Sequence, residues 1–381
     1  MGIFDSFKRS LKGYVPLKNA FTPFKAGGIE AKNRFFRSAT WLGLAAENGE
    51  VTQELTKRYS DLVRGDVGFI WTGLVSVSPE GVNLPRMLQL HSKQHIDSLG
   101  RLARSITRAG GKIGIQLAHG GAMSKREFNG RKPVLAPSEI RDPRTNEIKA
   151  NEISIPEIMR IISDFTHAAG AAKAMGFNAI QLHLAHGFLF NQFLSPRFNK
   201  RSDQYGGQRD GRAFIIKQTL EYIRNAIGND FPIWVKMNCS DFVANGQTED
   251  DALSLASHLM GWGVNGIEVS GGTPDSGKLG PCREVFKTID EAYFLSLALK
   301  IKKVSRLPVI LVGGIRSTGI IEDVLIKGID GISLSRPLIC EPLLVKRFSE
   351  GDLSPSICLS CNECFRYSYE SGAACAQFVE E

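Results

Sequence analysis

Eight short apolar runs recur along this chain of 381 residues, and stretches with helical periodicity separate them. The runs are nearly continuous in apolar residues, which is typical of strands buried on both faces of a parallel sheet. Regular alternation of such strands with helices predicts an α/β fold of the (β/α)8 barrel type. The candidate strands are Phe35–Ala39, Val67–Thr72, Lys112–Leu117, Asn178–His183, Ile233–Met237, Val264–Ser270, Pro308–Val312 and Gly331–Ser335.

The stretches between the runs predict helices, several of which end at a glycine as helix C-termini often do. The clearest are Ile155–Gly176, Arg212–Gly228, Asp250–Gly261, Thr288–Ser305 and Gly319–Gly328.

The predicted strands and helices also suggest how the chain divides. We expect residues 1–350 to form one barrel domain, with residues 1–32 closing its floor. The polar segment 120–151 is longer than an ordinary strand–helix loop, so it predicts a cap insertion over the barrel mouth. Residues 351–381 follow the barrel as a short C-terminal extension that contains a cysteine cluster.

The composition argues against several classes of protein. The formal charge is +8, but the basic residues are scattered and not interleaved with aromatics, so we expect no nucleic-acid partner. No apolar run is long enough to span a bilayer, and the N-terminus lacks the pattern of a signal peptide. We therefore expect a cytoplasmic protein without a membrane segment, in which cysteines do not form a disulfide framework.

Two histidines, His183 and His186, end the fourth apolar run. In a parallel barrel the active site lies at the carboxyl ends of the strands. Paired imidazoles there can hydrogen-bond an anionic oxygen near neutral pH, so they are candidate catalytic residues. The H-x-x-H spacing alone also fits two histidines satisfied inside a core.

The ends of the last two strands carry groups suited to a phosphate. Gly313 and Gly314 follow the seventh run, and Ser335 and Arg336 follow the eighth. In barrels these two loops often bind phosphate through backbone N–H groups, and glycine lets the backbone approach closely.

Two further strand ends carry groups suited to the ring of a flavin. Gln116 ends the third run, and its amide can both donate to and accept from the pyrimidine edge of an isoalloxazine. Lys236 ends the fifth run, where a cation would stabilise the anionic reduced form of the flavin.

The loop Asn191–Gly207, NQFLSPRFNKRSDQYGG, closely resembles the Old Yellow Enzyme family of flavin-dependent oxidoreductases, as do the histidine pair and the phrase FTPFKAGGIEAKNRF. The resemblance runs from about Phe21 to Phe348. It implies an FMN enzyme in which the two histidines grip the carbonyl oxygen of the substrate or a competing anion. The FMN-binding positions that it implies are Ala39, Thr40, Gly73, Gln116, Lys236, Gly313, Gly314, Ser335 and Arg336.

Two residues depart from the family pattern. Most ene-reductases of the family have a tyrosine that protonates the substrate two residues after the second histidine, but this chain has Phe188. Because a phenyl ring cannot donate a proton, the donor must be His183, His186 or solvent, or the reaction must differ. Trp41 falls where relatives often have a Thr or Cys that tunes the flavin.

Four cysteines near the C-terminus, Cys358, Cys361, Cys364 and Cys375, are spaced C-x2-C-x2-C-x10-C. Thiolates at this spacing can converge on one metal centre, either an iron–sulfur cluster or zinc, and the pattern is closer to ferredoxin-type ligation. The pattern also resembles the iron–sulfur branch of the family, with 2,4-dienoyl-CoA reductase and trimethylamine dehydrogenase. That resemblance implies a 4Fe-4S cluster.

These observations predict an FMN oxidoreductase that takes hydride from NADH or NADPH and delivers it to an activated alkene, an enone or an enoyl thioester. In the iron–sulfur branch two nucleotide-binding domains follow the barrel, but this chain has no strand–GxGxxG–helix unit. Electrons from a cluster would then pass to a separate electron-transfer protein, unless the cluster is structural. An amine-type dehydrogenase and an electron-transfer subunit are the alternatives. The substrate, the choice of nicotinamide and any homo-oligomer stay open.

Overall fold

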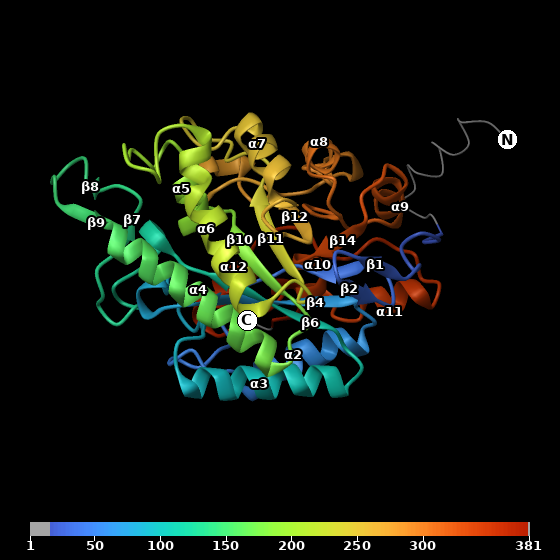
Figure 1. Ribbon diagram of the computed structural model, residues 1–381. Coiled ribbons are helices and arrows are strands. Elements are labelled where there is room, and N and C mark those ends of the chain that lie inside the picture. The colour runs from blue at the N-terminus through green and yellow to red at the C-terminus, as the bar shows by residue number, and fades with distance from the viewer. Residues whose placement is uncertain (1–15, 380–381) are drawn as a thin grey trace.

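The computed structural model describes residues 16–379, and parallel strands form a closed barrel at its centre (Figure 1). Each predicted run overlaps one strand, and β3 pairs with both β4 and β14, which closes the ring. The (β/α)8 barrel is therefore confirmed. Its strands, in order around the ring, are β3 (Phe35–Arg37), β4 (Phe69–Ser76), β6 (Ile113–Ala118), β10 (Ile180–Leu184), β11 (Ile233–Asn238), β12 (Gly266–Ser270), β13 (Val309–Val312) and β14 (Gly331–Leu334), with the short β5 (Leu88–Gln89) added beside β4.

Side chains along the barrel strands alternate between two environments. In β11, Ile233 and Val235 join the large core between strands and helices, whereas Trp234 joins a separate cluster. A Cβ at Gly266 would lie 2.4 Å from the Trp234 ring, so glycine makes room for the indole there. This second cluster, the aromatic floor of the barrel, is built around Phe24, Phe36, Phe69, Trp71 and Trp234.

The N-terminal hairpin closes the floor. Strands β1 (Phe24–Ala26) and β2 (Ile29–Ala31) pair antiparallel, and Trp234 donates its indole N–H to the Gly27 carbonyl at 3.0 Å. The predicted closure by residues 1–32 is thus confirmed for its described part, and residues 1–15 lie outside the described residues.

Helices surround the barrel (Figure 1), and side chains fix several of their starts. Ser154 and Glu157 form a capping box at α4 (Ile155–Met175), and Thr248 and Asp251 form one at α7 (Glu249–Leu259). None of the described helices is long and apolar enough to cross a membrane. The helices are α2 (Gln53–Arg64), α3 (Lys93–Arg108), α4 (Ile155–Met175), α5 (Leu189–Leu194), α6 (Arg209–Ile227), α7 (Glu249–Leu259), α8 (Leu295–Ser305), α9 (Thr318–Ile326), α10 (Arg336–Cys340), α11 (Leu344–Ser349) and α12 (Cys364–Glu370).

The prediction of a continuous helix over Thr288–Ser305 is wrong for its first half. Only a 3-10 turn, η4 (Thr288–Asp290), forms before α8 begins at Leu295. The break lies at Ala292, whose φ of 53° is left-handed. The preceding Glu291 turns its carboxylate inward, where it accepts the backbone N–H of Ser317 at 2.9 Å.

The insertion and the extension both adopt defined structure. The segment 120–151 contributes a 3-10 turn, η2 (Gly121–Met123), and a small sheet of β7 (Leu135–Ala136), β9 (Ile148–Glu152) and β8 (Ile140–Arg141). Strands β8 and β9 project from one edge of the molecule (Figure 1). The role of this segment as a cap and the boundary at residue 350 stay predictions.

Candidate active site

A large cavity opens at the carboxyl ends of the barrel strands. Together with the open space at its mouth, it encloses about 1260 Å³. All but one of the predicted catalytic and FMN-binding residues line it: Ala39, Thr40, Gln116, His183, His186, Lys236, Gly313, Gly314, Ser335 and Arg336.

Gly73 is the predicted residue that the structure does not bring to this cavity. Its backbone N–H donates to the Tyr59 hydroxyl at 2.7 Å. A Cβ at Gly73 would lie 2.8 Å from the Thr40 carbonyl oxygen. Gly73 therefore packs against Thr40, and its N–H is already engaged by the Tyr59 hydroxyl.

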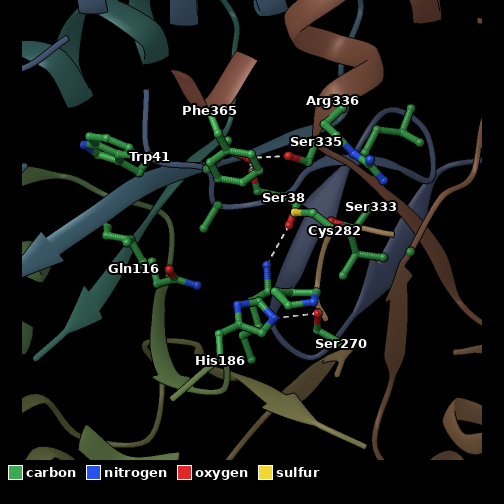
Figure 2. Close-up of a pocket in the computed structure, with 18 of the residues that line it drawn as sticks. Ser38, Trp41, Gln116, His186, Ser270, Cys282, Ser333, Ser335, Arg336 and Phe365 are labelled. Carbon is green, nitrogen blue, oxygen red and sulfur yellow. Dashed lines mark hydrogen bonds between the residues drawn. The ribbon is translucent and has the colours of Figure 1, made fainter. Parts of the chain in front are cut away.

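The histidine pair faces the cavity from the end of β10. His183 is the fourth residue of that strand, and His186 follows it with a left-handed φ of 60°. The His186 Nε2 lies 2.7 Å from the Ser270 hydroxyl, which comes from β12 (Figure 2). His183 Nδ1 is buried and has no hydrogen-bond partner among the described residues.

Both histidines are neutral near pH 7. Burial holds the pKa of His183 well below its usual value, and the neighbouring His186 and Lys236 act in the same direction. Burial and Lys236 likewise lower the pKa of His186. Each ring therefore offers one N–H donor and one acceptor nitrogen.

The two departures from the family pattern also line the cavity. The Phe188 ring packs on His183, with centroids 4.3 Å apart and an angle of 38° between the planes. Trp41 donates its indole N–H to the Pro85 carbonyl at 3.1 Å and packs edge-on against Tyr369. Trp41 therefore fills space and is held by contacts that do not involve a cofactor.

A set of polar side chains lies in the barrel directly above the aromatic floor. We call it the polar layer: Ser38, Gln116, Gln181, Lys236, Glu268 and Ser333. All six are buried. Lys236 donates to the Ser38 hydroxyl at 2.8 Å, and that hydroxyl donates to Glu268 at 2.5 Å. Gln116 and Lys236 were predicted from the sequence, whereas the other four residues were not. A charged residue inside the apolar run Val264–Ser270 was the available signal.

The loops after β13 and β14 form the other end of the cavity. Gly314 has a left-handed φ of 69°, and a Cβ there would lie 2.6 Å from the Tyr293 ring. The Ser335 and Thr40 hydroxyls lie 2.8 Å apart (Figure 2). Arg336 is buried beside them and adds a positive charge. Backbone N–H groups, hydroxyls and a guanidinium together suit a phosphate.

The C-terminal extension contributes to the same cavity. Ser360, Phe365 and Tyr369 line it, which the sequence analysis did not anticipate. Asn362 accepts from Arg336 Nη1 at 2.7 Å and donates to the Cys282 carbonyl at 3.1 Å. The extension thereby holds both Arg336 in the cavity wall and the loop after β12.

The four predicted metal ligands line one small cavity together with Cys340, and none of them is in a disulfide. They are Cys358, Cys361, Cys364 and Cys375. The Sγ atoms of Cys375 and Cys340 lie 3.5 Å apart. Within residues 16–379, however, no group of three or more His, Cys, Asp or Glu side chains is arranged to hold a metal ion. The thiols are gathered at one place but do not converge on one point.

The large cavity fits FMN by its donors and acceptors. Gln116 Oε1 and His183 Nδ1 are buried without partners among the described residues, and both residues line the cavity. Such atoms cost free energy unless a ligand or water satisfies them. The glycine loops and Arg336 suit the phosphate, and the amide of Gln116 with Lys236 suits the ring.

Comparison with known proteins agrees with this geometry. The chain is 34% identical over 349 residues to an NADH oxidase of Thermoanaerobacter brockii, covering 90% of this chain but 53% of that protein. It is 31% identical over 325 residues to an NADPH dehydrogenase of a Geobacillus species, covering 84% of this chain and 91% of the relative. The chain thus spans about half the length of the first relative and nearly all of the second.

A solved structure shares the fold. A 2-naphthoyl-CoA reductase superposes with a TM-score of 0.85 at 23% identity, covering 93% of this chain and 56% of that one. The model of the NADH:flavin oxidoreductase / NADH oxidase family matches residues 19–353. The chain therefore belongs to the NADH:flavin oxidoreductase / NADH oxidase family.

Proposed function

We propose that this protein is an FMN-dependent oxidoreductase that takes hydride from NADH or NADPH and reduces an activated alkene, an enone or an enoyl thioester. The observation that carries the proposal is the neutral histidine pair, which faces a cavity whose other walls suit FMN. The names of the sequence relatives, an NADH oxidase and an NADPH dehydrogenase, support a nicotinamide reductant of either kind.

When bound, FMN would accept hydride from the nicotinamide and pass it to the substrate. Gln116 and Lys236 would hold the ring, and Ala39 and Thr40 would flank it. Gly313, Gly314, Ser335 and Arg336 would hold the phosphate.

The histidines would bind and orient the alkene substrate. A neutral imidazole can donate its N–H to the substrate carbonyl oxygen, and this hydrogen bond strengthens as negative charge develops there. Ser270 holds His186 in place through the 2.7 Å contact with its Nε2. The pair therefore polarises the carbonyl without carrying a charge of its own.

The substrate carbon also needs a proton, which Phe188 cannot supply. The lowered pKa values of His183 and His186 argue against an imidazolium donor. The Cys282 thiol lines the cavity, and burial raises its pKa, so that it stays protonated near pH 7. We assign the proton to this thiol or to solvent at the open mouth.

The role of the histidines is tested by anaerobic stopped-flow spectroscopy. Protein reduced by NADPH is mixed with cyclohex-2-enone or crotonyl-CoA, and the return of the oxidised flavin absorbance is followed. We expect His186→Ala and His183→Ala to slow this step by about 10²–10³-fold, as for the loss of an oxyanion donor, while FMN stays bound. Equal rates in wild type and both variants would overturn the assignment.

We also propose that Cys358, Cys361, Cys364 and Cys375 bind a 4Fe-4S cluster. The support is the C-x2-C-x2-C-x10-C spacing and the shared cavity of the four thiols. Anaerobically purified protein should contain iron and acid-labile sulfide, and Cys361→Ser should remove both. Stoichiometric zinc without sulfide would overturn the proposal.

The cysteine cavity supports a second candidate function, an amine-type dehydrogenase or electron-transfer subunit that passes electrons to a separate protein. This cavity and the large cavity share Arg336 and Ser360 as walls, so two redox groups would lie close together. The two functions differ in their reductant. An amine-type dehydrogenase would be reduced by amines and left oxidised by NADH and NADPH.

A further inference from the structure

Glu268 is a buried carboxylate that has no role in the proposed hydride transfer. It lies in the middle of β12, between apolar neighbours, with no exposed surface. Burying an ionised carboxylate is costly unless several donors satisfy it. Glu268 is also the direct register partner of Lys236 on the neighbouring strand β11, so both side chains enter the barrel at the same level.

The contacts of Glu268 are all with donors. Its Oε1 accepts from the Ser38 hydroxyl at 2.5 Å and from the Ser333 hydroxyl at 3.0 Å. Its Oε2 accepts from Gln181 Nε2 at 2.9 Å. Lys236 Nζ lies 3.3 Å from Oε1 and also donates to Ser38. A group that only accepts from several donors is an ionised carboxylate.

We propose that Glu268 is a positioning residue that sets both the charge and the hydrogen-bond polarity of the barrel layer beneath the flavin. The inference rests on the proposed binding of FMN. Two consequences follow from the same contacts, one for the net charge near the ring and one for the orientation of Gln116.

The first consequence concerns charge. Lys236 alone would place an uncompensated positive charge at the base of the cavity and would favour the negatively charged reduced flavin. Glu268 offsets the charge of Lys236, and its field also reaches the buried guanidinium of Arg37. The bound flavin should therefore have a lower reduction potential than Lys236 alone would give it.

The second consequence concerns polarity. Because Glu268 only accepts, Gln181 must turn its NH2 group toward the carboxylate, which leaves its Oε1 facing Gln116. Gln116 then donates from Nε2 to that oxygen at 2.6 Å. Its own Oε1, which has no partner among the described residues, remains available to the cavity as an acceptor. The carboxylate thus fixes, through one amide, which atom Gln116 offers to the ring.

The test measures the midpoint potential of bound FMN and its dissociation constant in wild type, E268Q, K236M and the double variant. We expect E268Q to raise the ratio of affinities for reduced over oxidised FMN at least tenfold, which is about 30 mV for a two-electron couple. K236M should lower the potential, and the double variant should return it close to the wild-type value. Ser333→Ala removes one hydrogen bond but neither charge, so it should change the ratio less than threefold.

The proposal would be overturned if the ratio of affinities for reduced over oxidised FMN in E268Q lay within twofold of the wild-type ratio. A lower midpoint potential in E268Q than in wild type would overturn it as well. If E268Q alone does not fold, the comparison of K236M with K236M/E268Q carries the same test, because removing Glu268 must raise the potential in that background also. A wild-type protein that does not bind FMN would instead contradict the proposed function and leave the flavin without a site.

Discussion

The Phe188 ring packs against His183 in a tilted arrangement, with ring centroids 4.3 Å apart. The phenyl ring thus lies beside the group that would bind the substrate carbonyl, at the position where the family resemblance implies a proton-donating tyrosine. Phe188 therefore leaves this part of the cavity wall without an acid.

Phe188→Tyr should restore a donor at this position. We expect the oxidative half-reaction with cyclohex-2-enone to become about 100-fold faster, at the low end of the range for general acid catalysis, with reduction by NAD(P)H unchanged. Stopped-flow absorbance measures both steps, and Phe188→Leu is the control for lost packing. An unchanged rate in the tyrosine variant would mean that proton transfer does not limit this step.

Cys282→Ala removes the half-buried thiol from the cavity wall. If that thiol is the donor, oxidation by an enone should slow about 100-fold, and the solvent isotope effect on this step should change. Cys239→Ala is the matched control, because Cys239 is buried but is not part of the cavity wall. Equal rates for Cys282→Ala and wild type would assign the proton to solvent.

Asn362→Ala breaks the contact that holds Arg336 at the phosphate end. The loss of one hydrogen bond to a charged group costs about 1.5–3 kcal/mol, so FMN should bind roughly 10–100-fold more weakly. Riboflavin, which lacks the phosphate, should bind as before. Arg366→Ala, on an exposed face of α12, is the control. Equal weakening of FMN and riboflavin would place the effect in general folding of the extension.

His119 gives a pH dependence of stability that can be isolated. Burial lowers its pKa to about 4, and its Nε2 has no hydrogen-bond partner among the described residues. The unfolded chain binds this proton more readily, near a pKa of about 6.5. The stabilisation is therefore present above about pH 6.5 and is lost as the pH falls toward 4.

The loss due to His119 should amount to about 3 kcal/mol over that interval. The variant His119→Asn keeps an acceptor for the Gly121 N–H, which the ring's Nδ1 now accepts at 3.0 Å. Urea unfolding at pH 7 and pH 4.5 should show a smaller fall in unfolding free energy for this variant than for wild type. Parallel falls in the two proteins would contradict the lowered pKa.

The barrel could be predicted from the sequence because each strand is a short apolar run that can be recognised without knowledge of its neighbours in space. It also identified ten residues of the cavity wall, since strand ends in a barrel meet at one mouth. The place of Glu268 in the polar layer could not be predicted, because the partners of a single carboxylate within a strand are known only once the strands pair. One of these partners, Ser38, lies 230 residues away in the sequence. The contribution of Tyr369 to the cavity wall could not be predicted either, because it depends on how the C-terminal extension packs against Trp41.

The most direct test of the account is an anaerobic absorption spectrum of the purified protein before and after addition of NADH or NADPH. We predict flavin bands that bleach with one or both nicotinamides and return when cyclohex-2-enone or crotonyl-CoA is added. Flavin bands that neither nicotinamide changes, but that an amine bleaches, would contradict the proposed reductase and favour the amine-type dehydrogenase.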